Sequence, residues 1–304
     1  MIKSKIRGLT SSNLRFRGSF FSADSAAEIS KLFFDVITDL NFSCIRGFYF
    51  KFAPMRYFIE FSYHGKNYFG YQIQPREITV QEELEKALST ILREEIKTTG
   101  AGRTDTGVHA KKMFAHFDTE QALDENLPHR LNSFLPPDIS IKRIFPVKSD
   151  IHARFDATSR TYEYYISLEK NPFAQDSSWQ LWKRNLDIEK MNEACKILFE
   201  YEDFTSFAKL HTDNKTNNCK IYRAEWEQHG AELKFTISAD RFLRNMVRAI
   251  VGTMVEIGNG KIQPADLRKI IESKNRNSAG TSAPPQGLFL VDVGYDWGVD
   301  EIQQ

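Results

Sequence analysis

The sequence predicts an α+β fold of two similar halves, each a largely antiparallel sheet covered by helices on one face. Short stretches that alternate apolar and polar residues are separated by stretches with apolar residues at helical spacing, and this pattern restarts midway along the chain. With 304 residues, 41% of them hydrophobic and 13% aromatic, the chain can form about two packed units. A catalytic cleft is expected between the two open-faced halves.

The first half is expected in residues 55–157. Its predicted elements, in order, are a strand over 56–63, a helix over 79–93, a strand over 112–118, a helix over 127–135 and a strand from Ile139. Thr79 followed by Glu82 three residues later forms a capping box, which marks the start of the first helix.

The second half is expected in residues 158–304. Its predicted elements are a strand over 160–168, a helix capped by Asp187, a hairpin of 219–228 and 231–239, an apolar helix over 241–257, a shorter helix opened by Pro264 and a strand over 287–296. Tyr162 and Tyr164 share one face of the first of these strands, where core packing alone would explain both.

Residues 1–54 differ in charge from the rest of the chain. They carry eight Lys/Arg against four Asp/Glu, which leaves 33 against 36, a net charge of −3, for residues 55–304. This extension is predicted to be a disordered tail, a targeting segment or sequence outside the fold. Because the remainder is slightly acidic, a nucleic-acid site there must be a local basic patch.

Composition also restricts the cellular setting. The most apolar segment, near 242–257, contains Arg244 and Arg248 and is shorter than the roughly 18 residues that a membrane span needs. Three scattered cysteines form neither a disulfide framework nor a thiolate metal cage, which favours a reducing compartment and so the cytoplasm.

Residues 100–110 read Gly-Ala-Gly-Arg-Thr-Asp-Thr-Gly-Val-His-Ala and predict a special loop. Its glycines permit positive φ and close approach of another segment, and they place Asp105 on a tight turn. Arg103, two residues away, is a candidate to keep the Asp105 carboxylate ionised for work as a nucleophile or base. Turn statistics alone favour the plainer reading, in which Asp105 hydrogen-bonds its own backbone.

Two other classes of function compete at this point. Asp105-Thr106-Gly107 is also the aspartic-protease tripeptide, but that chemistry needs a second such carboxylate and the chain has no second copy of the motif. A non-catalytic RNA-binding module would also use aromatic residues on open sheets. The aromatic RNP consensus is absent, however, and a pure binder does not need an Asp on a glycine-rich loop.

The loop resembles the signature of the tRNA pseudouridine synthase A family, and the resemblance covers residues 55–296. The family pattern commonly has Ala at Thr106 and Trp at Tyr71, so this chain departs there while keeping a small and an aromatic residue. The other matching stretches are Phe69-Gly70-Tyr71-Gln72, Val80-Gln81, His152 to Phe155, Ala157 to Tyr164, Asp203 to Phe207, Phe242 to Gly252 and Gly287 to Leu290.

The resemblance implies an enzyme that isomerises uridine to pseudouridine in the anticodon stem-loop of tRNA, at about positions 38–40. It implies no metal or other cofactor, a homodimer, and no further protein partner. Asp105 is then the catalytic residue, and Tyr162 the active-site tyrosine that packs on the target base. Arg103 is our candidate for holding the flipped nucleotide or its phosphate. Tyr164 is assigned to the core.

Arginines gather on one face of the helix predicted over 241–257. At 100° per residue, Arg241, Arg244, Asn245, Arg248 and Gly252 fall on the same side. Solvated surface explains such a face as well as a strip that lines the cleft. The resemblance singles out Arg248 as the basic residue near the catalytic Asp, and Arg244 is a further candidate for tRNA contact. His109 is interpreted as fixing the loop rather than binding a metal.

Overall fold

The structure is a computed structural model that describes residues 54–182, 184–209 and 215–296. The predicted extension, residues 1–54, lies outside these described residues except for Pro54, so its nature stays a prediction. The elements below belong to one compact unit, Phe52–Gln304. None of the helices in the described ranges is long and apolar enough to cross a membrane.

The first half contains every element that the residue pattern predicts. Its elements are β1 (Met55–Tyr63), α2 (Val80–Leu92), β2 (Thr99–Gly100), β3 (His109–Thr119), α3 (Leu127–Phe134) and β4 (Ile139–Val147). Thr79 caps α2 as predicted, because its side chain accepts a hydrogen bond from the Glu82 amide. The short strand β2, which immediately precedes the glycine-rich loop, was not predicted.

The second half repeats this arrangement. Its elements are β5 (Ala157–Ser167), β6 (Trp179–Gln180), α4 (Ile188–Leu198), β7 (Ile221–His229), β8 (Glu232–Ala239), α5 (Met246–Gly258), α6 (Asp266–Glu272) and β9 (Leu288–Tyr295). Asp187 caps α4 through a 3.1 Å hydrogen bond from the Lys190 amide, as the sequence predicts. The predicted hairpin is present as β7 and β8.

The strand order confirms two similar halves. In the first half the order is β4-β1-β3-β2, and in the second it is β9-β5-β8-β7, so each half pairs its fourth, first, third and second main strands in turn. Most pairs are antiparallel, as predicted. The halves do not form separate sheets, however. β3 and β9 pair in parallel, His109 opposite Phe289 and Ala110 opposite Leu290, and this joins all strands into one sheet.

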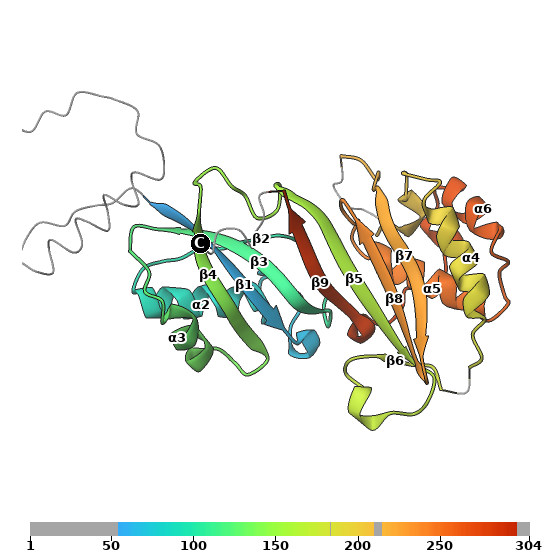
Figure 1. Ribbon diagram of the computed structural model, residues 1–304, viewed down its shortest axis with the longest axis horizontal. Helices are drawn as coiled ribbons and strands as arrows, with labels where there is room; N and C mark the ends of the chain where they lie inside the picture. The colour runs from blue at the N-terminus through green and yellow to red at the C-terminus, as the bar shows by residue number, and fades with distance from the viewer. Residues whose placement is uncertain (1–53, 183, 210–214, 297–304) are drawn as a thin grey trace, which may run out of the picture. The chain divides into compact units, whose positions relative to one another are not determined.

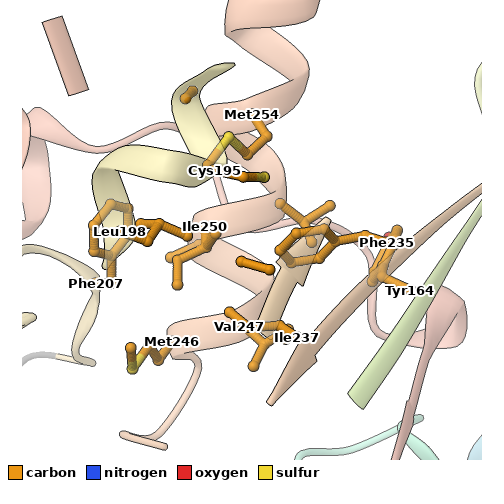
Figure 2. Close-up of a cluster of buried hydrophobic side chains, with 14 of the residues drawn as sticks. Tyr164, Cys195, Leu198, Phe207, Phe235, Ile237, Met246, Val247, Ile250 and Met254 are labelled. Carbon is orange, nitrogen blue, oxygen red and sulfur yellow. The ribbon is translucent and has the colours of Figure 1, made fainter. Parts of the chain in front are cut away.

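Each half has its own hydrophobic core. In Figure 1, α2 and α3 lie beside β1 and β4, whereas α4 and α5 lie beside β7 and β8 and α6 packs against α4. Figure 2 shows the second core, in which Cys195 of α4, Ile250 of α5 and Ile237 of β8 meet. Tyr162 of β5 packs against both cores. The functional candidates are therefore expected at the junction of the halves.

Candidate active site

The glycine-rich loop connects β2 to β3 through a tight turn. The Ala101 amide donates to the carbonyl of Phe114 at 2.7 Å, which holds the loop's start against β3. The Val108 amide donates to the carbonyl of Asp105 at 3.1 Å, and Gly107 between them has φ +77°. This left-handed conformation is strained for other residues, so Gly107 allows the turn. Asp105 therefore stands at the start of the turn, as predicted.

A neighbouring turn supports the loop from behind. Gly70 lies so close that a Cβ there would collide with the carbonyl oxygen of Thr104. The Tyr63 hydroxyl and the Thr104 hydroxyl are 2.9 Å apart, and the Gly107 amide donates to the carbonyl of Tyr68 at 3.3 Å. These contacts fix the backbone on both sides of Asp105. They also give the stretch around Gly70 a structural role, which is to support the loop.

His109 ties the end of the loop to both halves of the fold. Its Nδ1 accepts a hydrogen bond from the Gly65 amide at 2.9 Å, so Nε2 is the protonated nitrogen and donates to the Gln286 carbonyl at 3.1 Å. The side chain is buried, and this burial lowers the pKa of His109 to about 4. A neutral imidazole is the form that makes both bonds at pH 7. His109 thus braces the loop, in agreement with the sequence interpretation.

Two arginines of the second half face the Asp105 carboxylate. Arg248 Nη1 lies 3.4 Å from Oδ2, and Arg244 Nε lies 3.7 Å from Oδ1. Arg248 is also held by its own Nε, which donates to the Ala283 carbonyl at 2.7 Å. Its side chain is 19% exposed, compared with 58% for Arg244. Arg248 is therefore fixed in place beside Asp105, whereas Arg244 reaches it from the surface.

The expectation that Arg103 is the cation paired with Asp105 is wrong. Among the residues that the structure describes, Asp105 has ion pairs with Arg244 and Arg248, while the exposed side chain of Arg103 forms none with it. Neighbours in a turn often point apart, and here the cations come from a segment more than a hundred residues away. A role for Arg103 in holding the nucleotide stays a prediction.

The helix that carries Arg248 begins later than its apolar pattern predicts. α5 starts at Met246, so Arg241 and Arg244 lie in the preceding turn and share no helix face with Arg248. Asn245 interrupts the pattern with φ +67°, and its side-chain amide donates to the Ser282 hydroxyl at 2.7 Å. Arg244 therefore reaches the pocket from the turn before α5, and Arg248 reaches it from the first turn of the helix.

Gly252, for which the sequence predicted only a helix face, allows a close contact. It lies within α5, where a Cβ would collide with the carbonyl oxygen of Thr281. Gly252 thus permits the segment at 281–283 to pack directly on the helix. That segment includes the Ala283 carbonyl, which holds Arg248.

Tyr162 lies at the border of both cores and interacts electrostatically with Asp105. It lies on β5 opposite Ile237 of β8 and Leu290 of β9. Its ring meets that of Phe242 edge to face, with 5.3 Å between centroids, and it is near enough for electrostatic interaction with Asp105. Burial raises the pKa of Tyr162 to about 12, so its hydroxyl is neutral at pH 7.

Tyr164, two residues further along β5, has the structural role that was predicted. Its side chain is fully buried, and its hydroxyl donates to the Pro284 carbonyl at 2.8 Å. The two tyrosines of one strand face therefore differ in environment. Tyr162 is only half-buried and is the one that lies near the carboxylate.

Asp105, Arg244 and Arg248 line a pocket of about 390 Å³ between the two halves. The lining residues are Asp105, Thr106, Lys209, Arg244, Asn245, Arg248 and Ser282. Lys209 and Ser282 were not predicted as site residues. Lys209 is brought to the pocket by its amide, which donates to the Arg244 carbonyl at 3.0 Å. The only sequence signal for Lys209 is a basic residue in a polar loop, which is too common to identify a site.

The described residues bring no three His, Cys, Asp or Glu side chains together in a group that could hold a metal ion. His109 and His116 both accept a backbone hydrogen bond through Nδ1. His116 Nδ1 accepts from the Ala153 amide at 3.0 Å and holds the segment before β5 against β3. The pocket thus offers one carboxylate, three basic side chains and small polar groups to a substrate.

Comparison with known proteins matches most of the chain to the family that its glycine-rich loop resembles. The family model described as tRNA pseudouridine synthase matches residues 60–156 and 194–296. The chain is 55% identical over 242 residues to tRNA pseudouridine synthase A of Parabacteroides distasonis, covering 79% of this chain and 96% of that protein. It is 57% identical over 246 residues to the protein of that name from Bacteroides fragilis, covering 80% and 97%.

A more distant relative extends the match to another group of bacteria. The tRNA pseudouridine synthase A of Bacillus subtilis is 39% identical over 247 residues, which cover 80% of this chain and 100% of that protein. The matched regions include the loop that carries Asp105 and the segment that carries Arg244 and Arg248. The chain therefore belongs to the tRNA pseudouridine synthase family and is an enzyme of that class.

Proposed function

We propose that this enzyme converts uridine to pseudouridine in the anticodon stem-loop of tRNA, at about positions 38–40, and that Asp105 is its catalytic residue. One observation carries the proposal: a single carboxylate, held on a braced turn, faces a pocket whose opposite wall is formed by Arg244 and Arg248. A pocket of this charge suits a nucleotide, in which an anionic phosphate and a neutral base lie side by side.

The reaction makes modest demands on the protein. The bond from ribose to N1 of uracil breaks, the base turns, and a bond from ribose to C5 forms, while C5 loses a proton and N1 gains one. Product and substrate are isomers, so no electrons are exchanged with another molecule. An ionised carboxylate in contact with the nucleotide, and a pocket that retains the detached base, are the elements required.

The other pocket residues would bind and orient the nucleotide. A base must leave its stack to reach Asp105, and a ring that covers it offsets part of the few kcal/mol this costs. The half-buried ring of Tyr162 beside Asp105 suits this role. Arg248 would hold the Asp105 carboxylate in the orientation seen here, while the more exposed Arg244 would also contact a phosphate.

Replacement of Asp105 tests the proposal. We expect Asp105→Asn, which preserves shape and removes charge, to abolish pseudouridine formation, a loss of about a thousand-fold or more. Its affinity for tRNA should stay within a few-fold of wild type, because other residues supply the phosphate contacts. Asp124→Asn is the matched control, since Asp124 is an exposed carboxylate paired with Arg130 away from the pocket. Normal turnover in purified Asp105→Asn would overturn the mechanism.

The site of modification is tested separately. Carbodiimide primer extension on tRNA from a strain that lacks the gene, with and without the gene restored, maps each pseudouridine. We expect signals at about positions 38–40 to disappear in the deletion and to return with the wild-type gene but not with Asp105→Asn. Signals that disappear elsewhere in the tRNA would contradict the anticodon assignment and leave the role of Asp105 standing.

We also propose that the enzyme works in the cytoplasm and as a homodimer, so that one tRNA contacts both subunits. Multi-angle light scattering of the purified protein, alone and with tRNA, measures the number of subunits. A monomer that turns over normally would contradict the dimer.

A further inference from the structure

A half-buried arginine outside the pocket, Arg160, contacts three separate segments. The Arg160 guanidinium donates to four backbone carbonyls, those of Ala157 at 2.7 Å, Arg154 at 2.7 Å, Asp240 at 2.8 Å and Ala101 at 3.1 Å. Ala101 is two residues before Arg103, and Asp240 immediately precedes Arg241. The hydrogen bonds of Arg160 thus bring the backbones of three further arginines, Arg103, Arg154 and Arg241, close to one another.

These three arginines are not neutralised. In the described part of the chain, none of them has a carboxylate oxygen within 4.0 Å of its guanidinium. Asp240 is nearby, but its Oδ1 already accepts from the amides of Lys220 and Arg241. Burial, and then the charges of Arg103 and Arg241, lower the pKa of Arg154. Like charges held together in this way are suited to an anionic ligand.

An exposed aromatic ring lies next to these charges. The Phe155 side chain is 76% exposed, and its ring centroid lies 4.2 Å from that of His152. The Arg154 guanidinium is 5.9 Å from the same ring. The His152 contact supports one side of the ring and leaves most of its surface open. Positive groups beside an open aromatic ring are typical of sites that contact a phosphate and stack on a base.

We infer that Arg103, Arg154, Arg241 and Phe155, called here the Arg154 patch, form a second tRNA contact outside the Asp105 pocket. Its guanidinium groups bind backbone phosphates, and the Phe155 ring stacks on an unpaired base. Arg160 is the positioning residue that holds the patch together. The inference rests on the proposed function, because it takes tRNA as the ligand. It identifies the protein surface that the RNA strand contacts beyond the target nucleotide.

The stacking role is tested by binding of unmodified tRNA transcript, followed by fluorescence anisotropy at fixed salt. We expect Phe155→Ala to weaken binding about five-fold or more, and Phe155→Trp to retain wild-type affinity, since any aromatic ring can stack. Phe173→Ala is the matched control, because Phe173 is 97% exposed on a different loop. Equal affinities for Phe155→Ala and wild type would overturn the stacking role.

The phosphate role is tested by the salt dependence of the same binding. Arg154→Ala and Arg241→Ala should each reduce the slope of log affinity against log salt by about one unit, whereas Phe155→Ala should leave the slope unchanged. Arg268→Ala is the control, because Arg268 is neutralised by Glu200 at 2.6 Å. Slopes that stay at the wild-type value for both patch variants, or that fall equally for Arg268→Ala, would overturn this role.

The positioning role of Arg160 has its own readout. Arg160→Lys keeps the charge but loses the planar group that reaches four carbonyls, so its salt slope should fall towards that of the patch variants while circular dichroism stays unchanged. A folded Arg160→Lys protein with a wild-type slope would overturn that role. All these measurements follow binding rather than turnover. A wild-type enzyme that leaves the anticodon stem-loop unmodified would contradict the proposed function without changing them.

Discussion

The two walls of the Asp105 pocket are built in different ways. The loop wall is fixed from several directions, by the Gly70 contact, the Tyr63–Thr104 hydroxyl pair and the two hydrogen bonds of His109. The opposite wall includes the turn before α5, where Arg244 is 58% exposed and Asn245 has a left-handed backbone, together with Arg248 of α5 itself. The loop wall is held by contacts with the rest of the protein, whereas Arg244 on the opposite wall extends into solvent.

This difference separates two tasks. A catalytic carboxylate must keep its position to within a fraction of an ångström, and burial with hydrogen bonds on both sides provides that. A wall that receives RNA benefits from long cationic side chains that can adjust to the phosphate positions. Arg248 belongs to the first group, because it is 19% exposed and tied to the Ala283 carbonyl, although it comes from the same segment as Arg244.

The largest effect that distinguishes the two walls is expected from Arg248 and Arg244. Arg248→Ala should lower turnover about a hundred-fold, because a displaced Asp105 carboxylate no longer meets the reacting atoms. Arg244→Ala should instead weaken tRNA binding a few-fold, uniformly across tRNAs, and reduce the salt slope by about one unit. Measurement of kcat and KM separately for both variants checks this division.

Arg248→Lys sharpens the same comparison. It retains the positive charge but cannot contact both the Ala283 carbonyl and Asp105 with a planar fork, so its turnover should fall between wild type and Arg248→Ala. If Arg248→Ala and Arg244→Ala changed kcat and KM alike, both arginines would belong to a single RNA-contact strip.

A smaller effect is expected at Tyr162, which packs against both cores and interacts electrostatically with Asp105. Tyr162→Phe should keep most of the turnover because the ring remains, whereas Tyr162→Leu should lose about ten-fold or more, the scale of one lost stacking contact. Tyr164→Phe is the control. It loses the hydrogen bond to Pro284, so it should cost about 1 kcal/mol of stability and leave turnover close to wild type. A Leu variant as active as wild type would show that Tyr162 does not pack on the base.

The local pattern was enough to predict the elements of the fold but not how the halves join. Alternating strands, helical apolar faces and the caps Thr79 and Asp187 are features of neighbouring residues, and they appear as predicted. The parallel pair of β3 and β9 joins His109 to Phe289, residues far apart in the chain. Neither strand carries a signal that names its partner, so the single continuous sheet was not predicted.

The site shows the same limit. The tight turn at Asp105 and the bracing role of His109 could be predicted from the loop alone, because the glycines and the turn chemistry are adjacent in sequence. The catalytic role of Asp105 came from the family resemblance and stays a proposal. The start of α5 was placed too early because Phe242 and Leu243 continue its apolar pattern. Phe242 instead packs on the Tyr162 ring, and Leu243 is buried in the second core. Tertiary packing therefore replaced the first helical turn and moved Arg241 and Arg244 off the helix.

A still smaller effect, visible in stability rather than turnover, tests how firmly the loop wall is held. His109 and His116 both have a pKa lowered to about 4, mainly by burial. An unfolded histidine binds its proton near pH 6.5, so the unfolded state binds more protons between pH 6.5 and 4. Stability is therefore full above about pH 6.5 and is lost as pH falls towards 4.

Removal of one of these histidines should reduce this dependence. For His109→Gln, the free energy of unfolding should change with pH by about 1.4 kcal/mol per unit less than for wild type within that window. Denaturant titrations at several pH values provide the measurement. His129→Gln, a change at the exposed face of α3, is the control for loss of a histidine as such. Equal pH dependence in His109→Gln and wild type would show that the His109 brace does not depend on a neutral imidazole.

The smallest effect is expected from removing residues 1–54. Every residue assigned to either wall of the pocket, and every member of the Arg154 patch, lies between Tyr63 and Gln286. A protein that starts at Met55 should therefore fold, bind tRNA and turn over within about two-fold of the full chain. Its salt slope should also match, because the phosphate contacts proposed above do not include the eight basic residues of the extension. A lower slope with circular dichroism unchanged would instead show that the extension binds RNA, and that a part of the cationic wall lies outside residues 55–296.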